Sequence, residues 1–157
     1  MKKTLLSFVV DQWSTVPAVE NVDLTGKTVV IVGANAGIGF EAAKHVARMN
    51  PAKLILACRS ESKGVAAVSG EFPPSALFPC SCLQEIESAT GFKSCELWIV
   101  DLADFSSMTR FAERFQRECD RLDMLIMNAA ILPWGYEETV DGWESRSVFM
   151  SSMKRVR

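Results

Sequence analysis

Short, nearly continuous apolar runs alternate along this chain with stretches of helical periodicity. Runs of this kind are typical of parallel strands that are buried on both faces of a sheet. Four of them predict strands, over residues 27–32, 53–57, 96–100 and 123–127. Helices are predicted between the strands, over residues 37–49, from Ser60 to about Ser69, and after Asp104. Since consecutive parallel strands are joined by right-handed crossovers, this order predicts an α/β fold with a doubly wound parallel sheet, of which only the first four strands are present.

The spacing of apolar residues within two of these helices indicates which faces pack on the sheet. In the helix over residues 37–49, Ile38, Ala42 and Val46 fall on one stripe, with Ala43 and Ala47 beside it. Asp104 is a good N-cap for the later helix. The apolar positions of that helix recur every three or four residues, at Phe105, Met108, Phe111, Phe115 and Cys119.

Three segments lie outside this alternation. Residues 1–24 form an N-terminal segment whose apolar run, Leu5 to Val10, is too short to span a bilayer. Its helical spacing predicts an amphipathic helix, either packed on the domain or in peripheral contact with a membrane. Residues 70–82 are rich in proline and are expected to be a loop insert. Residues 144–157 read as an irregular tail, which leaves residues 25–143 as a partial nucleotide-binding domain.

Composition narrows the function classes. The chain has 157 residues, with 48% hydrophobic and 23% charged, and a net charge of −2. These values are typical of one globular domain and argue against a nucleic-acid binder, which would normally carry a basic patch. The five cysteines are odd in number and match no zinc spacing, so we expect reduced thiols, no metal site and a cytoplasmic location.

A glycine-rich turn follows the first predicted strand and opens the first predicted helix. Gly33, Gly37 and Gly39 have the spacing G-x-x-x-G-x-G. Glycines let a backbone approach a pyrophosphate closely, and the helix N-terminus offers free N–H groups to its charge. The turn therefore predicts a Rossmann-type dinucleotide site, with a turn that binds no ligand as the alternative.

Residues after the other strands indicate which dinucleotide binds. The second strand runs into Arg59, where an acidic residue would favour NAD, so the arginine favours the 2′-phosphate of NADP. Lys63, one helical turn later, adds to this positive site. A solvated surface charge is the alternative reading of Arg59. Asp101-Leu102 and Asn128-Ala129-Ala130 follow the third and fourth strands, at the edge where such sheets bind ligands.

Together these motifs resemble the short-chain dehydrogenase/reductase family, in particular its retinol-dehydrogenase-like and fungal reductase branch. The resemblance covers about residues 24–144 and includes Asp141-Gly142-Trp143-Glu144. It implies that Gly33, Asn35 and Gly39 hold the cofactor and that Asp101 contacts the adenine amino group. The cofactor-binding residues expected are Gly33, Asn35, Gly37, Ile38, Gly39, Arg59, Lys63, Asp101, Leu102, Asn128, Ala129 and Ala130.

The chain departs from the family pattern at the residues that would carry the chemistry. Ala130 stands where the family has glycine, a small change that we expect to be tolerated. The family's tyrosine and lysine occur as Tyr-x-x-x-Lys, but Val140 stands four residues after Tyr136, the only tyrosine. Ser151-Ser152 resembles the family's serine pair but has no downstream partner, so we assign no catalytic residue.

Three functions are therefore left open. The first is an NADP-dependent oxidoreductase by descent, which transfers hydride between the cofactor and a small carbonyl or alcohol. The second is a non-catalytic NADP(H)-binding module, and the third is a non-functional truncated fragment, since an uncovered fourth strand invites aggregation. The abrupt end of the resemblance at Glu144 leads us to expect a truncated product. Neither the substrate nor the oligomeric state follows from these motifs.

Overall fold

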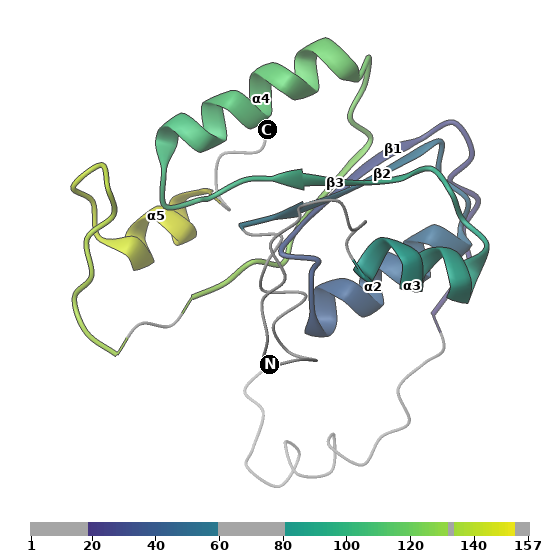
Figure 1. The fold of residues 1–157 in the computed structure, drawn as a ribbon, viewed down its shortest axis with the longest axis horizontal. Helices are drawn as coiled ribbons and strands as arrows, with labels where there is room; N and C mark the ends of the chain where they lie inside the picture. Colours follow the sequence, from purple (N-terminus) through teal and green to yellow (C-terminus); the bar gives the residue numbers. More distant parts are fainter. Residues whose placement is uncertain (1–18, 60–80, 132–133, 153–157) are drawn as a thin grey trace, which may run out of the picture.

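A computed structural model describes residues 19–59, 81–131 and 134–152 of the chain (Figure 1). Several predictions fall outside the described residues. They are the N-terminal amphipathic helix, the helix predicted from Ser60, most of the proline-rich insert, and Lys63. No helix in the described ranges is both long and apolar enough to cross a membrane. These same ranges contain no cluster of three or more histidine, cysteine, aspartate or glutamate side chains suited to a metal ion.

The centre of the fold is a parallel sheet of four strands. β1 (Thr28–Val32), β2 (Lys53–Cys58), β3 (Cys95–Ile99) and β4 (Met124–Met127) take the spatial order β3-β2-β1-β4. All three pairings are parallel. The chain therefore winds outward from β1 to β3 and then returns to the other side of β1, so its direction changes between β1 and β4. This arrangement confirms the predicted doubly wound sheet.

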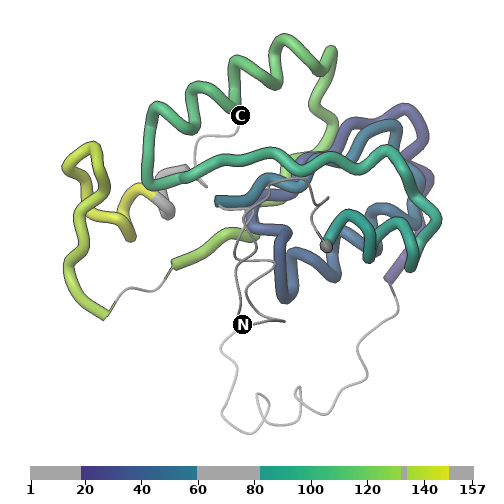
Figure 2. The backbone as a smooth tube through the Cα atoms, viewed as in Figure 1, coloured from purple at the N-terminus to yellow at the C-terminus, as the bar shows by residue number. Residues whose placement is uncertain are grey.

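Helices cover both faces of the sheet, as Figure 1 shows. α2 (Gly37–Arg48) and α3 (Ser81–Thr90) lie on one face, and α4 (Phe105–Glu118) lies on the other. α5 (Ser145–Ser152) lies beyond the edge toward which the carboxyl ends of the strands point, a path that the tube in Figure 2 makes easy to follow. The two faces therefore have separate hydrophobic cores.

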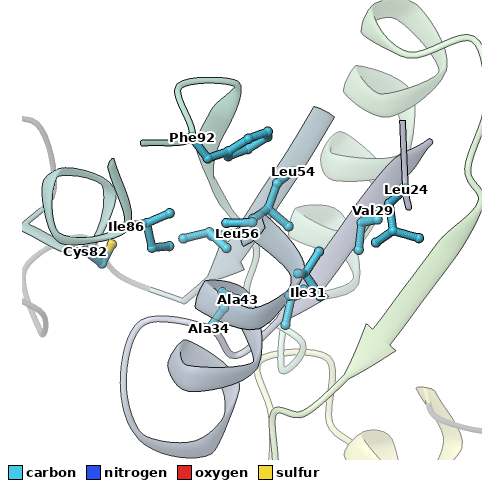
Figure 3. Packing of buried hydrophobic residues seen from close by; sticks show 12 residues of the cluster. Leu24, Val29, Ile31, Ala34, Ala43, Leu54, Leu56, Cys82, Ile86 and Phe92 are labelled. Atoms are coloured by element: carbon cyan, nitrogen blue, oxygen red, sulfur yellow. The ribbon is translucent and has the colours of Figure 1, made fainter. Parts of the chain in front are cut away.

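The strands are mostly apolar because successive residues enter opposite cores, and the exceptions include Lys53 at the start of β2 and Glu96 in β3. Val29 and Ile31 pack under α2 and α3, whereas Val30 and Val32 pack under α4. All five residues of β1 are buried. Figure 3 shows the first of these cores, where Leu54 and Leu56 of β2 lie with Ile86 of α3 and other residues labelled there. An alternating polar pattern would have placed charges in one core.

The core under α4 is organised around Trp98 of β3, which is 1% exposed. The rings of Phe111 and Phe115 meet the indole edge to face, with centroids 5.4 and 6.2 Å away. The Arg114 guanidinium carbon lies 4.1 Å from the centroid of the indole ring, and the indole N–H donates to Glu96 at 2.8 Å. Phe111 and Phe115 thus pack as their spacing predicted, whereas Phe105 is 39% exposed and lies outside this core, with its ring centroid 6.4 Å from that of Trp143. Asp104 is the N-cap of α4 and accepts from the Ser107 N–H.

Three further predictions made from the sequence are wrong in detail. Ile38 is 83% exposed and is not part of the buried stripe of α2, which consists of Gly39, Ala43, Val46 and Ala47. The first turn of α2 lies at the end of the sheet, so its apolar residue has no strand beneath it. α3 begins at Ser81, inside the expected loop insert.

The third correction concerns the tail, where α5 forms within the stretch expected to be irregular. Its helix begins where the Ser145 N–H donates to the Glu137 carbonyl at 2.8 Å. Ser145 and Val148 are 7% and 5% exposed, so tertiary packing stabilises a segment with weak local periodicity.

Candidate functional site

A cavity of about 460 Å³ opens at the carboxyl edge of the sheet, beside the change of direction between β1 and β4. Its volume falls in the range of about 300–1,000 Å³ that is typical of small-molecule sites. Loops that follow all four strands contribute to it. The lining consists of Val32, Gly33, Asn35, Ile38, Ala57, Arg59, Val100, Asp101, Leu102, Asn128, Ala129, Ala130 and Ile131.

The first part of the glycine turn, with Gly33 and Asn35, lines the cavity, and two glycines of the turn are required by close packing. Gly33 has φ +82°, and a β-carbon there would lie 2.7 Å from the main chain of Ala129. The Gly33 N–H donates to the Ala57 carbonyl at 2.7 Å. A β-carbon on Gly39 would meet the Gly33 carbonyl and lie 2.5 Å from the Asn128 amide nitrogen. These glycines let β1, β4 and α2 converge on one point.

Asn128 fastens this turn to the neighbouring strand. Its Nδ2 donates to the Gly33 carbonyl at 2.9 Å, and its main-chain N–H donates to Val32 at 3.0 Å. The family resemblance implies that the segment containing Asn128 shapes the central sheet and lines the cofactor, but it does not name a partner for the side chain. The structure adds a contact across 95 positions of sequence that holds the turn in shape. No local pattern could show this contact, because it depends on β4 lying beside β1.

The N-terminus of α2 faces this site without a side-chain cap. Its N-cap, Ala36, has extended backbone and makes no side-chain hydrogen bond, and the first turn contains no acidic residue. The first N–H groups of a helix have no partners within the helix, and together with the helix dipole they favour an anion. Gly37 has φ +63°, and a β-carbon there would meet nothing within 4 Å. The turn therefore offers N–H groups that suit an anion, with open space beside Gly37.

Asp101, which also lines the cavity, follows β3 and is therefore two strands away from the glycine turn that follows β1. Its Oδ1 accepts from the Ala103 N–H at 2.9 Å. Its main-chain N–H donates to the hydroxyl of Ser107 in α4 at 3.0 Å. Leu102 beside it is 8% exposed. The cavity thus has a fixed acceptor group at the end of β3.

The positive charge predicted after β2 also lines the cavity. Arg59 is exposed, and among the described residues its guanidinium makes no ion pair. A guanidinium can bind a phosphate through two parallel hydrogen bonds, so this side chain suits an anionic ligand in the cavity. The charge lies at the end of β2, between the loops after β1 and β3.

Most of the predicted site residues meet at this cavity. Gly37 and Gly39 do not line it and instead shape the turn behind it, and Lys63 lies outside the described residues. The sequence reading missed Val32, Ala57, Val100 and Ile131, which are also part of the lining. The first three sit at or next to the last residue of a strand, so the predicted strand ends were the signal that could have found them.

Tyr136 is not among the residues that line the cavity. It is 70% exposed, and its hydroxyl donates to Glu138 at 2.9 Å. This hydrogen bond raises the pKa of Tyr136 above its usual value, because the bond favours the protonated phenol. A tyrosine that served as a general base would need the opposite shift.

A parallel sheet with helices on both faces, and a glycine turn at its change of direction, defines a dinucleotide-binding class of protein. The family model described as short chain dehydrogenase matches residues 27–154, so the similarity does not end at Glu144 as predicted from the sequence. The chain belongs to this family of oxidoreductases. Retinol dehydrogenase 12 of Mus musculus is 38% identical over 125 residues, which cover 80% of this chain and 34% of the relative.

Further relatives agree with this assignment. The short chain dehydrogenase/reductase dmxR8 of Cryptosporiopsis sp. (strain 8999) is 36% identical over 126 residues, 79% of this chain and 34% of the relative. Among solved structures, a menthone neomenthol reductase from Mentha piperita is similar with a TM-score of 0.53 and 25% identity, over 68% of this chain and 32% of that one. The chain spans about a third of the length of these curated relatives.

Proposed function

We propose that the cavity binds NADP(H), and that the chain is the cofactor-binding part of an oxidoreductase acting on a small carbonyl or alcohol. The observation that carries the proposal is the position of Arg59 on the cavity wall, after β2. An arginine at this place suits the 2′-phosphate of NADP, where an acidic side chain would suit the ribose hydroxyls of NAD. The bound cofactor would supply or accept the hydride.

The remaining residues of the cavity fit the other parts of such a cofactor. The uncapped N-terminus of α2 and the open space at Gly37 suit the pyrophosphate. The carboxylate of Asp101 suits a donor such as the amino group of adenine, and Asn128 and Ala129 extend the binding surface along β4. The names of two similar proteins, a retinol dehydrogenase and a menthone neomenthol reductase, indicate alcohols and ketones as the substrate class.

The test compares NADPH and NADH binding by calorimetry in the wild-type chain and in Arg59→Asp. A charge-assisted hydrogen bond contributes about 1.5–3 kcal/mol, so we expect NADPH affinity to fall by about tenfold to a hundredfold. NADH affinity should change little, because NADH has no 2′-phosphate. Lys93→Asp is the matched control, since Lys93 is 81% exposed, changes the net charge equally, and precedes β3 at the opposite edge of the sheet. Unchanged preference for NADPH in Arg59→Asp would refute the assignment of Arg59.

A second candidate is an NADP(H)-binding module without turnover. It is favoured by Tyr136, the only tyrosine, which lies outside the cavity and bonds to Glu138. Incubating the chain with NADPH and a panel of aldehydes and ketones distinguishes the two candidates. NADPH consumption above background would exclude the second candidate, whereas binding without consumption would support it.

A further inference from the structure

A buried hydroxyl in the first turn of α4 touches the loop that forms one wall of the cavity. Ser107 is 8% exposed, and its Oγ accepts from the Asp101 N–H at 3.0 Å. Its own main-chain N–H donates to the side chain of Asp104, the N-cap of α4, at 3.2 Å. The hydroxyl therefore belongs to the first turn of α4 and binds Asp101, a residue that lines the cavity.

The neighbours of Asp101 are held by the core, since Val100 and Leu102 are 5% and 8% exposed and the Val100 N–H donates to the Cys58 carbonyl at 2.9 Å. Asp101 itself has fewer contacts. The Asp101 carboxylate accepts from Ala103 at 2.9 Å, and the Asp104 N–H donates to the Asp101 carbonyl at 3.3 Å. Both contacts are within the loop itself or at its junction with α4. The Ser107 contact ties the main-chain N–H of Asp101 to a side chain in the first turn of α4.

We propose that Ser107 is a positioning residue for NADP(H), which fixes the main chain of Asp101 so that its carboxylate meets the adenosine half of the cofactor. This inference rests on the proposed function. Without the hydroxyl, the partly buried Asp101 N–H loses its acceptor and the loop must shift to reach water. A hydrogen bond weakens steeply when its geometry changes. A shift of the loop should therefore weaken the hydrogen bond between the Asp101 carboxylate and the cofactor.

The first experiment measures binding of NADPH and of adenosine 2′,5′-bisphosphate, which contains only the adenosine half. Ser107→Ala should weaken both probes by about three- to tenfold, which corresponds to one lost hydrogen bond. Ser107→Thr keeps the hydroxyl and should restore most of the affinity. Ser106→Ala is the matched control, because Ser106 is the exposed neighbour on the same helix turn and should leave affinity unchanged.

The second experiment is a double-mutant cycle with Asp101→Ala, which separates positioning from general destabilisation. If Ser107 acts through Asp101, Ser107→Ala should change affinity by no more than about twofold in the Asp101→Ala background. Equal losses in both backgrounds, or wild-type affinity in Ser107→Ala, would overturn the inference while leaving the proposed function intact. Absence of NADPH binding by the wild-type chain would overturn both.

Discussion

Replacing Gly33 with alanine would put a methyl group where the structure has no room for one. The new β-carbon would lie 2.7 Å from Cα and N of Ala129, which are main-chain atoms that cannot rotate away. Relieving the clash requires the end of β4 to move from β1. That movement would break the hydrogen bond from Asn128 Nδ2 to the Gly33 carbonyl, now 2.9 Å long.

The magnitude follows from three contributions to the free energy of unfolding. An alanine at positive φ costs about 1–2 kcal/mol relative to glycine. Overpacking at a rigid site costs about 1–3 kcal/mol more. Loss of the Asn128 hydrogen bond adds about 1 kcal/mol. We therefore expect Gly33→Ala to lower the free energy of unfolding by about 3–6 kcal/mol.

Gly26 is a matched control for the backbone contribution. It has φ +78°, close to the +82° of Gly33, but a β-carbon on Gly26 would meet nothing within 4 Å. Gly26→Ala should therefore cost only about 1–2 kcal/mol. Urea unfolding of both variants measures the difference, which isolates the contact with Ala129. Equal destabilisation of the two variants would show that this close approach is not what requires glycine at position 33.

Two further predictions concern stability away from the cavity. Trp98→Ala should lower the free energy of unfolding by about 3–5 kcal/mol in the same urea assay, because a fully buried indole is removed from the core under α4; a loss below about 1 kcal/mol would contradict that core. The main-chain hydrogen bond from Thr28, aided by Arg121 and Lys27, lowers the pKa of Asp123 from 3.8 to about 2. Because the folded state favours the carboxylate, this contribution should be complete above the unfolded pKa and disappear as pH falls through the folded value. Urea unfolding at several acidic pH values should show a smaller decrease with pH in Asp123→Asn than in the wild-type chain, and parallel curves would contradict the assignment.

Strand positions and the core of the fold could be predicted because both depend on local patterns. β1 is a continuous apolar run after Thr28, and helices cover both faces of the sheet, so the sequence of β1 alone indicates full burial. The predicted ends differ from the observed ones by a residue or so, as at Thr28 and Met124. α5 could not be predicted, because its buried residues, Ser145 and Val148, repeat no strong apolar period and depend on tertiary contacts.

The sequence alone determined the chemistry of this site, whereas the tertiary structure decided its geometry. Short local patterns predict three features of the site, because each follows directly after an apolar strand. These features are the glycine spacing, Arg59 and Asp101. The sheet order β3-β2-β1-β4 then brings those ends together, since the change of direction beside β1 opens one cavity between loops distant in sequence. Gly33 needs glycine because Ala129 lies against it, and that contact exists only once β4 pairs with β1.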